Sequence, residues 1–134
     1  MFSYNAPLYS LLTIYISSSV FCQIVDTQCR HGWIRNGTSC YLFVDTTETW
    51  SSAQAHCKSV HESYLAEITS QEENDFIKMH LMQLHGKSEK NDRIYWIGGS
   101  DFEFEGEWRW SASDEIVEYT DWQPGQPDDF HQQE

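Results

Sequence analysis

Short stretches of alternating apolar and polar residues occur early in the chain. Trp33 and Ile34 precede an Asn36-Gly37 pair, and residues 39–44 (Ser-Cys-Tyr-Leu-Phe-Val) are rich in residues that favour strands. An Asn-Gly pair is a strong signal for a tight turn between two antiparallel strands. The pattern therefore predicts a β-hairpin with its turn at Asn36-Gly37.

The spacing of apolar residues then changes to that of helices. Trp50, Ala53 and Cys57 recur at helical intervals, and Thr46 and Thr47 are candidate N-caps. We predict a first helix over residues 49–59.

A second helix is predicted from residue 71 to about Gly86. Ser70 stands three residues before Glu73, which is the spacing of a capping box at a helix start. The residues expected on its apolar face are Phe76, Ile77, His80, Leu81 and Leu84.

Three further segments have the composition of short strands. They are residues 64–68 (Tyr-Leu-Ala-Glu-Ile), 94–99 (Ile-Tyr-Trp-Ile-Gly-Gly) and 107–110 (Glu-Trp-Arg-Trp). Beyond residue 111 the sequence contains turns, acids and prolines but little sign of regular structure. The length of 134 residues predicts one domain.

The formal net charge of −13 argues against two classes of binding partner. Nucleic acids and anionic membrane surfaces are recognised by basic patches, which this composition does not supply. From Asp101 onward, Arg109 is the only Lys or Arg, among eleven acids. A solvated acidic face is one interpretation, but Trp108, Trp110 and Trp122 lie between these acids and indicate folded loops that could bind cations.

Residues 7–22 form an uncharged, mostly apolar or small run. The run is too short and too rich in serine for a membrane span, and it is typical of a secretory signal peptide. We predict that residues 1–22 are a signal peptide and that the mature domain comprises residues 23–134. An N-terminal tail that is merely apolar is the alternative.

Secretion into an oxidising compartment makes the cysteines disulfide candidates. Cleavage after Cys22 leaves Cys29, Cys40 and Cys57. Cys29 and Cys40 can staple the predicted hairpin, whereas Cys57 has no evident partner, which indicates a free thiol, a partner chain or a missing segment. Asn36-Gly37-Thr38 is also an N-glycosylation sequon.

The last stretch of the chain contains the main candidate for binding chemistry. Gln126 and Asp128 place oxygen atoms on either side of Pro127. Calcium binds six to eight oxygen ligands from carboxylates, carbonyls and water. The stretch therefore fits part of a calcium site, although an ordinary Pro/Gly/Asp turn uses the same residues.

The ordered set of motifs resembles the C-type lectin domain in its long form. The match runs from Cys29 to Glu134. Its motifs are Gly32-Trp33, Cys40-Tyr41, Trp50 with Ala53 and Cys57, Leu65-Ala66-Glu67-Ile68, Tyr95-Trp96-Ile97-Gly98, Trp108-x-Trp110 and Gln126-Pro127-Asp128. The resemblance implies a compact domain of the α+β class. Two helices would pack on antiparallel strands, and a long irregular loop would carry calcium and sugar.

In that family the cysteine matching Cys57 pairs with one near the C-terminus, and a last strand follows the Gln-Pro-Asp region. Neither is present before Glu134. The resemblance therefore implies that the domain is incomplete at its C-terminus.

The resemblance also implies ligands for two calcium ions. Gln126, Asp128 and Glu134 match the primary calcium and sugar ligands. Asp101, Glu105 and Asp129 match an accessory calcium site, with solvated loop acids as the alternative for the first two.

The order of amide and acid in Gln126-Pro127-Asp128 is that of family members selective for galactose and N-acetylgalactosamine. Phe130 stands where such members carry an aromatic residue, usually Trp, that packs on the apolar face of the sugar. The alternative is that Phe130 only anchors the loop.

The sequence thus predicts a secreted, calcium-dependent lectin that binds glycans or glycoproteins, in the manner of innate immune pattern recognition. The alternative is a module that does not bind sugar and instead binds proteins or mineral and matrix. No nucleophile, phosphate-loop or zinc motif is found, so no enzymatic activity is expected. The oligomeric state is open.

Overall fold

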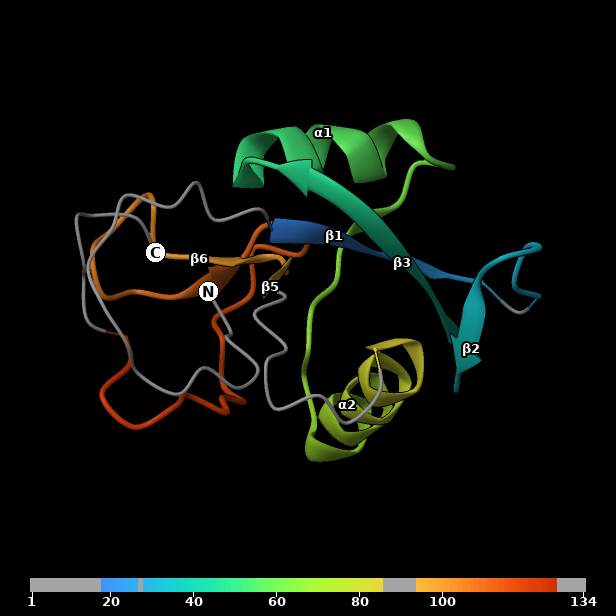
Figure 1. Cartoon of the computed structure of the whole chain (residues 1–134). Coiled ribbons are helices and arrows are strands. Elements are labelled where there is room, and N and C mark those ends of the chain that lie inside the picture. The colour runs from blue at the N-terminus through green and yellow to red at the C-terminus, as the bar shows by residue number, and fades with distance from the viewer. Residues whose placement is uncertain (1–17, 27, 86–93, 128–134) are drawn as a thin grey trace.

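The computed structural model describes residues 18–26, 28–85 and 94–127, and its architecture is α+β (Figure 1). The predicted signal peptide up to residue 17, and Asp128, Asp129, Phe130 and Glu134, lie outside the described residues. In Figure 1 the strands β1 and β3 lie between the two helices, and the irregular segments after residue 98 gather at one end.

The main sheet contains five strands within the described residues, in the order β2-β3-β1-β4, with β5 also paired to β1. The strands are β1 (Ser18–Val25), β2 (Ile34–Asn36), β3 (Ser39–Glu48), β4 (Tyr64–Leu65) and β5 (Ile94–Trp96). All pairs are antiparallel except β1 with β5. A separate pair, β6 (Gly99–Ser100) and β7 (Arg109–Trp110), lies beyond β5 in the sequence.

The central strand β1 was not predicted from the sequence. It pairs with β3 from Ser18–Glu48 to Val25–Ser39, and its Cys22 forms a disulfide with Cys57 of helix α1. The expectation that Cys57 has no partner in this chain is therefore wrong. The predicted cleavage point after Cys22 falls inside β1; the structure is that of the uncut chain, and the signal peptide stays a prediction.

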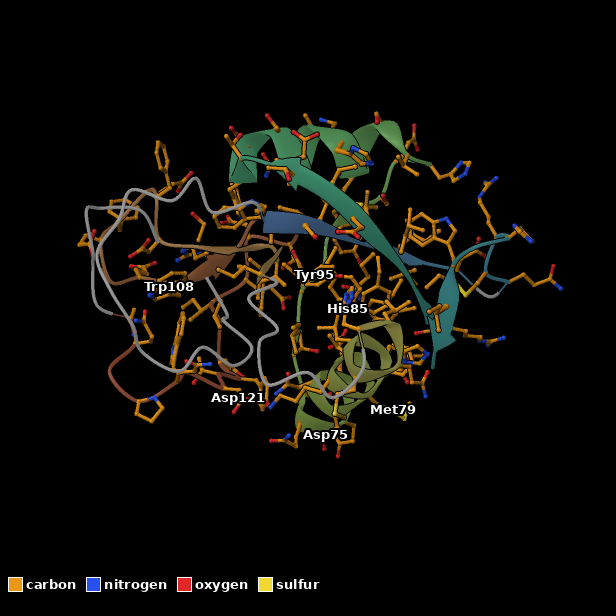
Figure 2. All side chains as sticks on the ribbon, in the orientation of Figure 1. Asp75, Met79, His85, Tyr95, Trp108 and Asp121 are labelled. Atoms are coloured by element: carbon orange, nitrogen blue, oxygen red, sulfur yellow. A yellow bond between two sulfur atoms is a disulfide. The ribbon has the colours of Figure 1, made fainter. Side chains whose placement is uncertain are left out.

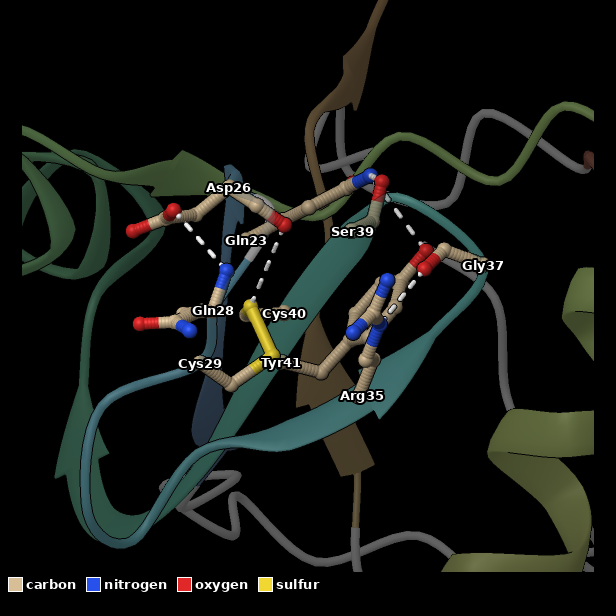
Figure 3. The surroundings of a disulfide bond; sticks show 9 residues. All are labelled: Gln23, Asp26, Gln28, Cys29, Arg35, Gly37, Ser39, Cys40 and Tyr41. Atoms are coloured by element: carbon tan, nitrogen blue, oxygen red, sulfur yellow. Dashed lines mark hydrogen bonds between the residues drawn. A yellow bond between two sulfur atoms is a disulfide. The ribbon is translucent and has the colours of Figure 1, made fainter.

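The predicted hairpin is confirmed as β2 and β3, but its turn is Gly37-Thr38, one residue later than predicted. Asn36 pairs with Ser39, and Gly37 has φ 58°, a left-handed conformation that glycine adopts without steric cost. Arg35 Nε donates to Gly37 O across 2.9 Å and closes the turn. The predicted disulfide between Cys29 and Cys40 is also present (Figure 3).

Helix α1 (Trp50–Ser59) matches the prediction closely, but its N-cap differs. Thr49 is the cap, and its Oγ1 accepts the backbone N–H of Ser52 across 3.2 Å. The candidates Thr46 and Thr47 lie instead in β3, which continues to Glu48 because it pairs with the unforeseen strand β1.

Helix α2 (Gln71–His85) begins with the predicted cap, since Ser70 Oγ accepts the backbone N–H of Glu73 across 3.2 Å. The Glu73 carboxylate reaches the backbone N–H of Thr69 rather than that of Ser70. Ile77 is buried and Phe76 packs against the core as predicted, whereas Leu84 is exposed, contrary to the prediction.

The two faces of β1 bury two different sets of side chains, because alternate residues of a strand point to opposite faces. Val20 and Cys22 pack with Ala53 and Cys57 of α1. Phe21 packs on the opposite face with rings of β3, its centroid 5.4 Å from that of Tyr41 and 4.5 Å from that of Phe43. Ile77 of α2 belongs to this second cluster. The sheet is therefore buried on both sides.

A polar network lies within the α2 side of this core. Gln23 is 6% exposed; its Oε1 accepts the backbone N–H of Glu67 across 2.9 Å, and its Nε2 donates to Tyr41 Oη across 3.3 Å. Tyr41 donates in turn to Glu73 Oε1 of α2. Burial, together with the Glu73 carboxylate, raises the pKa of Tyr41 far above its ordinary value.

Neither α1 nor α2 is long and apolar enough to cross a membrane, and the described residues contain no other helix that could.

Candidate functional site

The loop region, residues 98–127, is attached to the sheet through Gly98. The backbone N–H of Gly98 donates to Ala66 O, and its C=O accepts from Ser111. A Cβ at Gly98 would stand 2.8 Å from Leu65 O, so a larger residue would force these backbones apart. Trp50 and Trp96 brace the same junction by donating from their indole N–H groups to Ile97 O and Glu48 O.

Glu67 fixes the turn that follows β7 in the loop region. One of its oxygens, Oε1, accepts the backbone N–H groups of both Ala112 and Ser113, each across 3.0 Å. A carboxylate that accepts two main-chain N–H groups fixes the position of the turn that follows β7.

Asp101, a predicted accessory calcium ligand, follows β6 directly. Its side chain is 9% exposed, and Oδ2 accepts the backbone N–H of Gly106 across 3.2 Å. This bond closes residues 101–106 into a compact loop that also contains Glu105, whose side chain is exposed.

Trp108 and Trp122 pack against each other across the loop region. Their ring centroids are 4.9 Å apart at an interplanar angle of 66°, an edge-to-face arrangement that favours aromatic pairs. Figure 2 shows Trp108 on the loop side of the molecule. The pair joins the segment after β7 to the segment that leads to Gln126.

Helix α2 binds that last segment through Asp121. Asn74 Nδ2 donates to Asp121 Oδ2 across 2.8 Å, and Lys78 forms an ion pair with the same oxygen. The Lys78 ammonium and the Asn74 amide hold the pKa of Asp121 below its ordinary value. Asn74 also donates to Tyr119 Oη across 2.8 Å. Two residues of the last segment are thus fixed to α2.

Gln126 lies at the end of a tight turn. Its backbone N–H donates to Gln123 O across 2.9 Å, and Gly125 has φ 92°. Proline at the second position and a left-handed glycine at the third are typical of a type II turn. The Gln126–Pro127 peptide bond is cis, and both residues are exposed to solvent.

Three of the predicted ligands are described: Asp101, Glu105 and Gln126. Asp101 and Glu105 share one closed loop, and Gln126 stands on a separate exposed turn. Asp128, Asp129, Phe130 and Glu134 fall outside the described residues. Between residues 18 and 127, apart from the gaps at 27 and 86–93, no three His, Cys, Asp or Glu side chains form a metal cluster. The calcium ligand sets therefore stay predictions.

The chemistry of the described candidates nevertheless fits a hard cation. Asp101 is a nearly buried carboxylate with one main-chain donor, and Gln126 presents an exposed amide. Both supply oxygen, the ligand atom that calcium prefers.

The residues that position the candidates were not identified from the sequence. Glu67 was noted only as part of a family motif, and Asn74, Lys78 and Asp121 were not singled out. One pattern could have indicated that Asn74 is buried. It stands three residues before Ile77 and therefore lies on the same side of α2.

Comparisons with known proteins match the part of the chain that contains the candidate site. The family profile described as "Lectin C-type domain" matches residues 46–134. The chain is 30% identical over 125 residues to a "Perlucin-like protein" of Mytilus galloprovincialis, which covers 93% of this chain and 77% of that protein.

A second relative is the "Galactose-specific lectin nattectin" of Thalassophryne nattereri. It is 34% identical over 102 residues, which cover 76% of this chain and 60% of that protein. Among solved structures, the "Human Scavenger Receptor C-type Lectin carbohydrate-recognition domain" superposes with a TM-score of 0.65 at 31% identity, covering 77% of this chain and 72% of that one.

Proposed function

Because this chain belongs to the C-type lectin family, we propose that it is a secreted, calcium-dependent protein that binds galactose-type glycans and catalyses no reaction. The observation that carries the proposal is the exposed Gln126 turn, which lies inside the matched region and precedes Asp128 in the sequence.

The calcium ligands that we propose come from the loop region and from the residues that follow it in the sequence. Gln126, Asp128 and Glu134 would hold the primary ion. Asp101, Glu105 and Asp129 would hold an accessory one. Bound calcium would supply coordination positions to two neighbouring sugar hydroxyls.

The chain's own residues would orient the sugar. A hydroxyl can donate to the carboxylate of Asp128 and accept from the amide of Gln126. The order of these two groups selects which face of the sugar is accepted, because the donor and the acceptor are not interchangeable. Phe130 would pack on the apolar face of galactose. The 34% identity to a galactose-specific lectin supports this preference.

Affinity chromatography tests the proposal. The chain should bind immobilised galactose in calcium, elute with a chelator, and bind immobilised mannose less well. Retention that a chelator does not change would reject calcium-mediated binding, and a protein-binding or matrix-binding role would then be favoured.

A double variant tests the proposed preference for galactose over mannose. The double substitution Gln126→Glu with Asp128→Asn should move preference from galactose towards mannose. The control makes the same two chemical changes on exposed positions of α2, Gln83→Glu with Asp75→Asn, and should leave the preference unchanged. An unchanged preference in the loop variant would reject the assigned roles of Gln126 and Asp128.

A further inference from the structure

A cavity of about 220 Å³ lies between the start of α1 and the β6–β7 pair. None of the proposed calcium or sugar ligands lines it. Its walls come from Trp50 at the start of α1, from the loop that joins β6 to β7, and from the turn after β7. It is therefore separate from the Gln126 turn.

Aromatic rings form much of the cavity wall. Trp110 is 2% exposed, and Trp50 is held in place because its Nε1 donates to Ile97 O across 2.9 Å. Phe102 also lines the cavity, yet it is 95% exposed. The cavity is therefore lined by three aromatic residues, of which Trp50 is fixed by a hydrogen bond and Phe102 is open to solvent.

The charged groups around the cavity are mostly acidic. Glu103, Glu107 and Asp114 carry three formal negative charges, and Arg109 carries one positive charge, which leaves −2. The charge balance favours a cation over an anion.

The guanidinium of Arg109 is already engaged by oxygens of the protein. Its Nε donates to Glu107 Oε1 across 2.8 Å, and its Nη1 donates to Asp114 O across 2.9 Å. Its Nη2 lies 2.6 Å from Glu107 Oε1. These contacts stabilise Arg109 as part of the wall, so it is poorly placed to recruit an acidic ligand.

We propose that this cavity binds an alkylammonium group. The face of an aromatic ring attracts cations, and Trp is the strongest of the aromatic residues in this interaction. Glu107 and Asp114 already form ion pairs with Arg109, so Glu103 is the carboxylate that adds a Coulombic attraction, which a neutral sugar hydroxyl would not receive. The site goes beyond sugar binding, and none of the proposed calcium ligands lines it.

Nuclear magnetic resonance of the 134-residue chain tests the site directly. The indole N–H signals of Trp50 and Trp110 are followed during titration with tert-butylammonium chloride, in a chelator and at constant ionic strength. A saturable shift is expected. Neutral tert-butanol and anionic pivalate have the same shape and should bind at least about tenfold more weakly, since they lack the positive charge. Equal shifts from all three probes, or no saturation by the ammonium, would overturn the proposal.

Two further probes separate the sources of such a group. Choline carries a quaternary ammonium and Nα-acetyl-lysine amide carries a primary one. Binding of either supports the site, and the tighter of the two identifies its ligand class. Binding of neither would overturn the proposal, whatever the result on galactose, because the titration is made without calcium.

Matched variants locate the interaction. Phe102→Ala and Glu103→Gln change exposed residues of the cavity, and each should weaken binding of tert-butylammonium by about threefold or more. The controls Phe104→Ala and Glu115→Gln change exposed residues outside the lining and should leave the dissociation constant unaltered. Equal losses in variants and controls would contradict the assigned cavity.

Discussion

The side-chain amide of Asn74 donates to the carboxylate of Asp121 across 2.8 Å, over a separation of 47 residues. Asn74 is 1% exposed, so a buried residue of α2 holds the segment that leads to Gln126. Lys78 joins the same carboxylate, and Tyr119 is bound to the same helix. The position of the Gln126 turn therefore depends on the packing of α2.

Acidification should weaken this attachment. Lys78 and Asn74 lower the pKa of Asp121 below its ordinary 3.8, so its contribution to stability is complete above that value and is lost as pH falls through the lowered pKa. Urea unfolding between about pH 5 and pH 2 should show a smaller loss of stability in Asp121→Asn than in the unchanged chain.

Glu118→Gln provides the matched control for that comparison. Glu118 is an exposed acid in the same segment, and its substitution should leave the pH dependence as it is. An identical pH profile for Asp121→Asn and the unchanged chain would show that the Asp121 attachment does not contribute.

Loss of the disulfide between Cys22 and Cys57 should destabilise the uncut chain more than loss of the one between Cys29 and Cys40. The first closes a loop of 35 residues and the second a loop of 11. Loop entropy alone gives roughly 4 and roughly 3 kcal/mol, respectively. Paired Cys→Ser variants compared by urea unfolding measure both values.

A chain beginning at Gln23 extends the disulfide test to the predicted cleavage. It lacks Cys22 and five of the eight residues of β1, so Cys57 should react with a thiol reagent in the folded state if the chain still folds. Full protection of Cys57 in that shortened chain would contradict the role assigned to β1.

Removal of the hydroxyl of Tyr41 should be costly, since Glu73 would lose a buried donor and Gln23 a buried acceptor. Tyr41→Phe is expected to lower the free energy of unfolding by about 1–3 kcal/mol. Tyr64→Phe on strand β4, which pairs with β1, serves as the comparison and should cost less. A double-mutant cycle with Glu73→Gln gives the coupling energy, and a value near zero would contradict a shared hydrogen bond.

Calcium should raise the thermal stability of the chain through Asp101. At a tenfold excess over its dissociation constant, a ligand adds roughly 1.4 kcal/mol, or several degrees in melting temperature for a domain of this size. Asp101→Asn keeps an oxygen for the Gly106 N–H but removes the charge, so it should reduce the shift.

Two controls accompany the calcium measurement. Asp114→Asn, at an exposed loop acid, should retain the full shift. Magnesium should give a smaller effect, because it requires a stricter octahedral geometry. No stabilisation of the unchanged chain at any calcium concentration would contradict Asp101 as a ligand.

The helices and the hairpin could be predicted because their signals are local. Trp50, Ala53 and Cys57 repeat at a helical interval, Ser70 and Glu73 stand at cap spacing, and Gly37 fits a left-handed turn. Each of these signals depends on residues close together in sequence.

The strand β1 could not be predicted in the same way. A short apolar run is compatible with a buried strand, a helix core or a signal peptide, and periodicity does not distinguish them. Only pairing with β3, and the bond from Cys22 to Cys57, identifies it as a strand. The wrong end for β3 and the wrong cap for α1 follow from that one omission.

The candidate site was predicted by resemblance and only partly by residue chemistry. Asp101 and Gln126 could be named because their side chains and neighbours match a known pattern. Glu67, Asn74 and Asp121 could not, because their partners are 45 to 47 residues away in sequence and depend on the topology.

The β2–β3 hairpin and residues 98–127 lie at opposite ends of the main sheet (Figure 1). A biotin or a sensor chip coupled at Asn36 would therefore hold every molecule with its loops facing the flowing analyte. Oligosaccharide added at this asparagine by a host cell would likewise leave the opposite end uncovered.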